Sequence, residues 1–163
     1  MTTALNSILQ QITEETLENL AFVFSFSGDE DDDMENHAEA TVVSVSFSGP
    51  FSGCIEMHLP SEALPEIAAN MLGLEEEETT KDDQHGAVCE ALNVICGNLL
   101  PVIAGKEVVF DIDSPGILSM ENKKDPERAD AQTLLILDNG PCLLLLWLSD
   151  DAHGQLIDAT LET

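Results

Sequence analysis

One stretch of the chain, from Asp82 to the region of Gly105, carries apolar side chains at the spacing of an α-helix. Residues three and four apart lie on the same side of a helix, so these side chains form one ridge. The ridge consists of Val88, Leu92, Ile95, Leu99 and Ile103, with Ala91, Cys89 and Cys96 beside it. We expect Asp82 or Asp83 to cap this helix, and Pro101 to kink or end it because the proline ring meets the carbonyl of Gly97. An apolar ridge of this length needs a second layer of structure to cover it.

The second layer is predicted to be a sheet, because several segments alternate apolar and polar residues. Residues 43–47 and 55–59 alternate cleanly and are separated by glycine and proline, which predicts an antiparallel hairpin with one buried face. His58 falls on the polar face of that hairpin, so we expect it to be exposed and not to act as a ligand. Further strands are expected at 108–112, at 132–137 and 142–148 around an Asn139-Gly140 turn, and as a short final strand at Leu156 and Ile157.

Two further segments have helical periodicity. Residues 3–22 contain neither glycine nor proline and repeat apolar side chains near the helical period. A shorter helix is expected after Pro60, with Ser61 as its N-cap, Pro65 in its first turns and Gly73 just beyond its end. Together these elements predict an α+β fold, a mostly antiparallel sheet packed against helices, in a single domain that spans residues 1–163.

The charge of the chain is strongly one-sided. It has 32 acidic residues against five basic ones, a formal net charge of −27, and no Lys or Arg before Lys81. Nucleic acids and anionic membrane surfaces would repel such a chain, so neither is expected as a partner. Solubility, for instance in a salty cytoplasm, explains the acidity more simply than an electropositive partner does, because charge runs are usually solvated.

The densest acidic run lies within residues 27–39. Like charges at this density cannot pack, so we expect a mobile loop. The run invites comparison with a calcium-binding EF-hand loop that would start at Asp29. That pattern fails, because Met34 stands where glycine is needed and Ala40 where a bidentate Glu is needed. Two more charged loops are expected, at 75–78 and at 122–130.

The four cysteines indicate neither disulfides nor a metal clip. None of them forms a C-x-x-C pair, and the seven-residue spacing of Cys89 and Cys96 places both on one side of the long helix. We therefore expect no zinc site and four reduced cysteines in the core of a cytoplasmic protein. A secretory signal is not expected either, because the first basic residue is Lys81, and the longest apolar run, 141–148, is too short to span a membrane.

A second stripe on the long helix consists of Gly86, Glu90, Asn93 and Gly97. Their spacing makes Glu90 and Asn93 project side by side, with a glycine on either side of the pair. Each glycine costs the helix about 1 kcal/mol relative to alanine, and the flat surface that results suits close docking of another backbone. The simpler interpretation is that a Glu and an Asn three residues apart belong to the ordinary solvent-exposed face of a helix. Spacing alone does not decide between the two.

The stretch Glu90-Ala-Leu-Asn93-Val-Ile-Cys-Gly97-Asn98, followed after a strand by Pro115, resembles the signature of the CheC/CheX/FliY chemotaxis phosphatases. The similarity extends to residues 53–57, 61–73 and 133–148 and so covers nearly the whole chain. CheC-type members usually carry two Glu-x-x-Asn motifs, whereas this chain has one, so the resemblance is closest to the CheX type. The family often has Asp or Ser four residues before the Glu, where this chain has Gly86.

The resemblance implies a CheC/CheX-like fold and a phosphatase that hydrolyses the aspartyl phosphate of a CheY-like response regulator, in chemotaxis or related two-component signalling. In that role Asn93 would hold the attacking water, because an amide donates and accepts at once. Glu90 would pair with a lysine of the regulator, and Gly86 and Gly97 would lie against the partner. The chain would need no cofactor of its own, because the Mg²⁺ belongs to the regulator. The resemblance also implies a homodimer through edge strands, for which the apolar segment 143–147 is the candidate.

Two other functions stay open. A non-catalytic adaptor that binds a response regulator or a flagellar switch component would also use the stripe, and Gly86 in place of Asp or Ser favours it. An acidic, salt-adapted structural domain would explain the charge but not the stripe.

Overall fold

The computed structural model describes residues 2–28 and 39–157, so most of the predicted acidic loop, including Asp29 and Met34 of its EF-hand-like pattern, lies outside the described residues. The helices are α1 (Thr2–Ala21), α2 (Leu64–Leu72) and α3 (Lys81–Ala104). The strands are β1 (Phe26–Ser27), β2 (Ala40–Ser48), β3 (Gly53–Pro60), β4 (Asp111–Ile112), β5 (Gly116–Leu118), β6 (Ala131–Leu137) and β7 (Gly140–Leu148). Short 3-10 helices occur at Ser61–Ala63, Glu76–Glu78, Met120–Asn122, Pro126–Arg128 and Asp150–Gly154.

Within the described residues seven strands form one sheet, in the order β1-β6-β7-β3-β2-β4, with β5 also paired to β2. All of the pairings are antiparallel. Both predicted hairpins are present: β2 pairs with β3, and β6 pairs with β7 through the turn at Asn139-Gly140. The prediction of an α+β fold with an antiparallel sheet is therefore confirmed. The apolar β7, in contrast, is a central strand between β6 and β3 and not an edge.

The long helix α3 agrees with the predicted span, but its two ends differ from the prediction. Its N-cap is Thr80, not Asp82 or Asp83, because the Thr80 hydroxyl accepts from the Asp83 N–H and the Asp83 carboxylate accepts from the Thr80 N–H, each at 3.0 Å. At the other end the helix continues past Pro101 to Ala104, so the proline does not end it. Gly97, whose carbonyl loses its helical partner to the proline, is exposed, and water can take that place.

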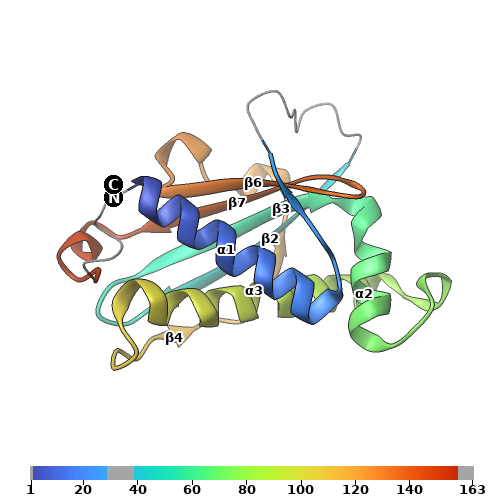
Figure 1. Ribbon diagram of the computed structural model, residues 1–163, viewed down its shortest axis with the longest axis horizontal. Coiled ribbons are helices and arrows are strands. Elements are labelled where there is room, and N and C mark those ends of the chain that lie inside the picture. Colours follow the sequence, from blue (N-terminus) through green and yellow to red (C-terminus); the bar gives the residue numbers. More distant parts are fainter. Residues whose placement is uncertain (1, 29–38, 158–163) are drawn as a thin grey trace.

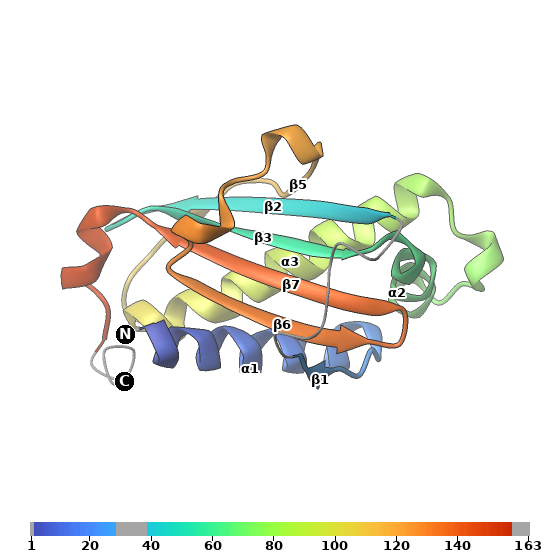
Figure 2. The ribbon, with the colours of Figure 1, turned by 90° about the horizontal axis from the view of Figure 1, so that it is seen from above.

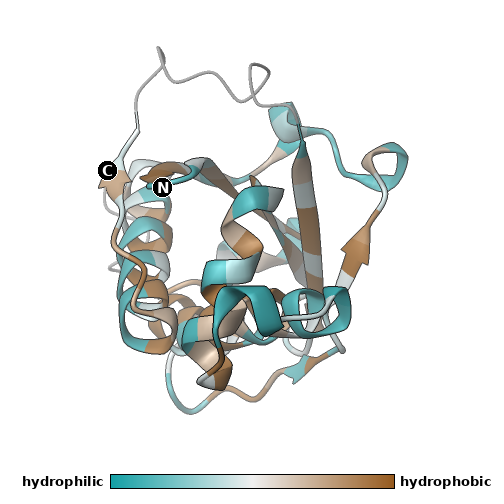
Figure 3. Cartoon of the chain, turned by 90° about the vertical axis from the view of Figure 1, so that its right-hand side faces the viewer, coloured by the Kyte–Doolittle hydropathy of each residue, from teal (hydrophilic) through white to brown (hydrophobic). Residues whose placement is uncertain are grey.

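Helices cover one face of the sheet. Figure 1 shows α1 and α3 side by side across the strands, with α2 at one end of the layer. In Figure 3 the hydrophobic sides of these helices turn inward and their hydrophilic sides turn outward. The predicted apolar ridge lies in this core and is fully buried: Val88, Leu92, Ile95, Leu99 and Ile103. By length and composition α3 could cross a membrane, but its apolar side is buried in the fold, so it is a core helix.

The second face of the sheet is also buried along β3, which contradicts the prediction that the hairpin of β2 and β3 has one buried face. Glu56 and His58 on β3 point to this face and are only 1% and 5% exposed. The prediction that His58 is exposed is therefore wrong. Its ring Nε2 lies 3.0 Å from a Glu56 carboxylate oxygen, which supplies the partner that a buried polar side chain requires.

The segment at 119–130, of which 122–130 is predicted as a charged loop, covers this second face at β3. It crosses the strands on the side away from α3 (Figure 2). The Lys124 N–H donates to the other Glu56 oxygen at 2.9 Å, and the Trp147 indole N–H donates to the Asp125 carbonyl at 3.2 Å. The Lys124 ammonium also lies 5.9 Å from the centre of the Trp147 ring, within cation–π range. Alternation along β3 indicates which side chains share a face, but it cannot show that a distant loop covers the polar one.

The remaining differences are local. The strand expected at 108–112 is reduced to β4, and β5 was not predicted. Pro115, which has no N–H to donate to β2, separates these two short strands. Helix α2 begins at Leu64 after a 3-10 turn, so Ser61 is not its N-cap, whereas Gly73 ends it in the expected left-handed conformation, with φ of 70°. No strand forms at Leu156 and Ile157.

All four cysteines are free thiols, as predicted. Burial raises the pKa of Cys54 to about 11 and the pKa values of Cys96 and Cys142 to about 12. These three side chains therefore carry almost no thiolate at neutral pH and contribute packing rather than reactivity.

Candidate functional site

The four residues Gly86, Glu90, Asn93 and Gly97, named here the α3 stripe, lie together on the outer side of α3. Gly86, Glu90 and Gly97 are exposed, and Asn93 is half-buried. The opposite side of the helix is the buried ridge that packs on the sheet. The core therefore fixes the orientation of the helix, and that orientation presents the stripe outward on a rigid element.

The glycines of the α3 stripe serve no internal packing. Apart from its chain neighbours and the backbone of α3 itself, a Cβ atom added at Gly86 or at Gly97 would meet no atom of the described residues within 4 Å. Neither glycine has the positive φ at which a side chain would be strained. Because glycine weakens a helix interior by about 1 kcal/mol relative to alanine, the two glycines carry a cost that the fold itself does not explain. What the two glycines can provide is a flat surface that another molecule can approach closely.

Glu90 and Asn93 are available to an external partner. Within residues 2–28 and 39–157, neither side chain forms a hydrogen bond or an ion pair. No buried side-chain polar atom of the described chain lacks a partner, so the carboxamide of Asn93 reaches solvent although the residue is half-buried. The Glu90 carboxylate, a charged acceptor, thus lies beside the Asn93 amide, which can both donate and accept.

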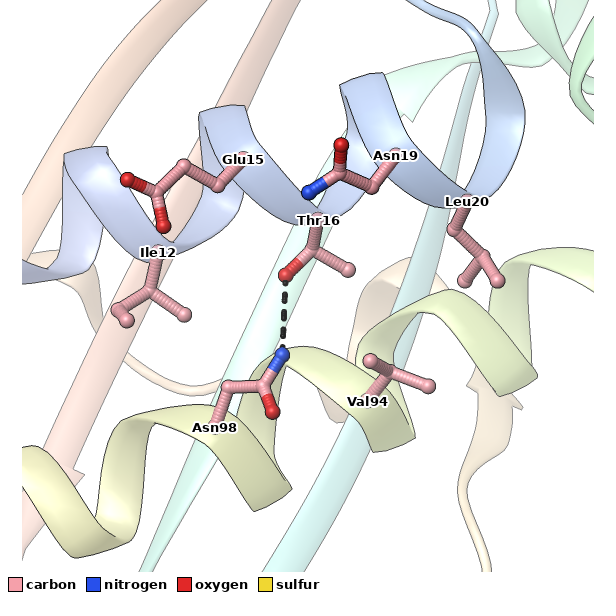
Figure 4. Close-up of a pocket in the computed structure, with 7 residues that line it drawn as sticks. All are labelled: Ile12, Glu15, Thr16, Asn19, Leu20, Val94 and Asn98. Carbon is pink, nitrogen blue, oxygen red and sulfur yellow. Dashed lines mark hydrogen bonds between the residues drawn. The ribbon is translucent and has the colours of Figure 1, made fainter.

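A cleft that no pattern in the sequence predicts lies beside the α3 stripe. It has a volume of about 270 Å³ and lies where α1 and α3 run next to each other (Figure 4). Its lining residues are Ile12, Glu15, Thr16, Asn19, Leu20, Val94 and Asn98. In the sequence, the only sign of this cleft is that the polar residues Glu15 and Asn19 are four apart and so share one side of α1. That this side faces Asn98 becomes visible only when α1 is packed beside α3.

The described residues contain no group of three or more His, Cys, Asp or Glu side chains that could hold a metal ion. The groups that the α3 stripe offers to a molecule docked on α3 are the carboxylate of Glu90 and the amide of Asn93.

Comparison with known proteins identifies the family. A family model described as "Chemotaxis phosphatase CheX" matches residues 41–136, more than half of the chain. The chain belongs to the CheX family. The matched region includes all of α3 and therefore the complete α3 stripe. A search of curated proteins gave no match.

Solved CheX structures share the fold of this CheX-family chain. The chemotaxis protein CheX from Desulfovibrio desulfuricans has a TM-score of 0.66 at 17% identity, with 89% of this chain and 99% of that chain covered. CheX from Vibrio vulnificus has a TM-score of 0.69 at 14% identity, covering 89% and 96%. A structure described as the CheX–CheY–BeF3–Mg²⁺ complex from Borrelia burgdorferi has a TM-score of 0.65 at 18% identity, covering 88% and 97%. At these identities the matches show the fold and not the activity.

Proposed function

We propose that this chain hydrolyses the aspartyl phosphate of a CheY-like response regulator. The observation that carries the proposal is the α3 stripe: Glu90 and Asn93 face outward without partners within the described residues, and two glycines that no internal contact requires accompany them. The family is named for chemotaxis phosphatases, and one of its members has been crystallised with CheY.

In this proposal Asn93 positions the attacking water. Its amide N–H and carbonyl oxygen can hold one water molecule in line with the phosphorus. Positioning of the reactants is a large part of how proteins catalyse phosphoryl transfer. The water oxygen forms a bond to phosphorus while the bond to the aspartyl oxygen breaks. The electron pair of that bond returns to the regulator's carboxylate, and the water proton leaves with the inorganic phosphate or passes to solvent.

Glu90 and the glycines hold the two proteins together in the same proposal. The carboxylate of Glu90 pairs with a lysine of the regulator's site, while Gly86 and Gly97 let the regulator's backbone approach α3 closely. The regulator brings its own Mg²⁺, which neutralises charge on the phosphoryl group. In this proposal the chain acts in the cytoplasm, where the phosphorylated response regulator is located.

A non-catalytic adaptor is the second candidate, and Gly86 is the residue that favours it, because the family often has Asp or Ser there. One measurement separates the two functions: the decay of phosphate from candidate response regulators, with and without this chain. A phosphatase shortens the lifetime of the phosphorylated regulator. An adaptor binds the regulator and leaves that lifetime unchanged.

The glycines provide a prediction in which stability and docking change in opposite directions. Gly97→Ala is expected to raise the free energy of unfolding in urea by about 1 kcal/mol, because alanine favours the helix and its Cβ would clash with no other part of the described fold. Gly97→Gln keeps most of this helix gain but lays a long side chain across the α3 stripe. We expect it to weaken binding of the regulator by about tenfold, which corresponds to 1.4 kcal/mol. Undiminished binding by Gly97→Gln would show that close approach at this glycine is not required.

We also propose that the chain forms a homodimer. The structure points to a different strand for the dimer contact than the sequence does. Because β7 is central, the apolar segment 143–147 cannot form it. Strand β1 is an edge strand, and the exposed fractions of Phe22, Phe24 and Phe26 in and before it are 65%, 65% and 72%. Exposed aromatic side chains beside an open strand edge are typical of a protein–protein contact.

Sedimentation at micromolar concentration is expected to show a species of twice the chain mass, strengthened by added salt because both copies are acidic. Replacing Phe24 and Phe26 with serine should give a monomer. Met120→Ser, which removes a side chain that is 51% exposed elsewhere, is the matched control and should remain dimeric. A wild-type monomer under these conditions would reject the dimer.

A further inference from the structure

The cleft between α1 and α3 combines apolar walls with a polar rim (Figure 4). Ile12, Leu20 and Val94 contribute the aliphatic surface, and all three are half-buried. Glu15, Asn19 and Asn98 are exposed at the rim. The Asn98 amide nitrogen lies 3.5 Å from the Thr16 hydroxyl oxygen and donates to it, which leaves the Asn98 carbonyl oxygen available as an acceptor.

The cleft adjoins the α3 stripe. Val94 and Asn98 each follow a stripe residue, Asn93 and Gly97, by one position, and successive residues of a helix are about 100° apart around its axis. The cleft therefore opens on the flank of the stripe that faces α1. A protein seated on Glu90 and Asn93 would cover the cleft with the adjoining part of its surface.

The size and charge of the cleft define what fits it. A volume of about 270 Å³ lies at the lower limit of small-molecule pockets, so one inserted side chain suits it better than a separate ligand. An anion is disfavoured by the Glu15 carboxylate and by a net charge of −27. A side chain with an aliphatic stem and a cationic end matches both the walls and the rim.

Among the described residues, no cation pairs with Glu15. Its carboxylate accepts a hydrogen bond from the Gln11 amide at 3.1 Å, and it forms no ion pair within the described part of the chain. The sequence has no Lys or Arg before Lys81, so α1 carries no basic residue that could neutralise it. A cation that pairs with Glu15 in this cleft would most simply come from another molecule.

We propose that the cleft between α1 and α3 receives a Lys or Arg side chain of the response regulator that docks on the α3 stripe. The inference rests on the proposed function and adds a second point of attachment to it. Glu15 binds the cationic end, the carbonyl oxygens of Asn19 and Asn98 accept its remaining hydrogen bonds, and the aliphatic stem lies on Ile12, Leu20 and Val94. The second point of attachment strengthens binding of the regulator, while Glu90 and Asn93 position its phosphoryl group.

The test is a steady-state assay of phosphate release from the regulator, with Glu15→Lys as the main variant. We expect the KM for the phosphorylated regulator to rise about tenfold, since reversing one charge of an interfacial pair turns attraction into repulsion, and kcat to stay within about twofold. Glu18→Lys is the matched control: it makes the same charge change on an exposed residue of α1 that does not line the cleft, and its KM should change by less than about threefold.

The reciprocal experiment identifies the inserted residue. Each surface Lys or Arg of the regulator is replaced by Glu in turn, and one of these variants should restore a low KM to the Glu15→Lys enzyme. Equal KM values for Glu15→Lys and Glu18→Lys would mean that only general charge matters and would overturn the inference, as would an unchanged KM for Glu15→Lys.

Failure of the proposed function gives a different result, because the wild-type chain would then leave the phosphate lifetime unchanged. In that case the same variants are ranked by their affinity for the beryllofluoride-activated regulator. A loss confined to Glu15→Lys would support the cleft, and the absence of such a loss would overturn it.

Discussion

Asn93→Ala should slow hydrolysis of the regulator's aspartyl phosphate by about a hundredfold or more, the loss seen when one positioned group is removed from an active site. The alanine removes the amide that donates to and accepts from the attacking water, and water from solvent then has to find the in-line position by chance. The measurement is single-turnover decay of the phosphorylated regulator at saturating concentrations of the variant, so that weaker binding cannot imitate slower chemistry.

The same variant should keep its fold and its affinity. Asn93 is half-buried but has no hydrogen-bond partner in the part of the chain that the structure describes, so its truncation breaks no internal hydrogen bond. Binding to the beryllofluoride-activated regulator should stay within about threefold of wild type, a change of less than 1 kcal/mol. Hydrolysis by Asn93→Ala at the wild-type rate would reject the water-positioning role.

Glu90→Ala is expected to weaken binding of the phosphorylated regulator by about thirtyfold, because truncating one partner of a buried, hydrogen-bonded charge pair costs about 2 kcal/mol or more. Glu90 is exposed in the free protein and would become covered only when the regulator docks on the α3 stripe. Titration of the activated regulator, by calorimetry or by fluorescence, measures the change.

Two controls accompany this prediction. Glu18→Ala removes an exposed helical carboxylate from α1 and should leave the affinity nearly unchanged. Glu90→Gln keeps the size of the side chain and loses only its charge, so it should reproduce most of the loss if the partner is a lysine. An affinity of Glu90→Gln equal to that of wild type would indicate that Glu90 contributes shape and not charge.

The predicted site depends on local periodicity, and local periodicity is what a sequence displays directly. Glu90 and Asn93 are three residues apart in a long helix, so any folded form of that helix places them side by side. The apolar ridge on the other side of the same helix determines which side is buried. The orientation of the α3 stripe toward solvent could therefore be predicted before the sheet that buries the ridge was known.

The burial of Glu56 and His58 and the cleft at Glu15 could not be predicted in this way. Glu56 is buried under the segment at 119–130, where the Lys124 N–H, 68 residues further along the chain, donates to its carboxylate. The cleft exists because α1 packs beside α3, so that Thr16 comes within hydrogen-bond distance of Asn98, 82 residues away. Neither contact has a periodic signature.

The sequence by itself therefore determined the α+β class, the two main hairpins, the long helix and the outward side of that helix, because these features follow from the spacing of apolar residues along short segments. Only the tertiary structure decided that β7 is central, that both faces of β3 are buried and that a second polar surface stands beside Glu90 and Asn93. Those features arise where segments distant in the sequence meet. The free energy of such a contact depends on the shapes and hydrogen-bonding groups of both segments, which neither segment displays on its own.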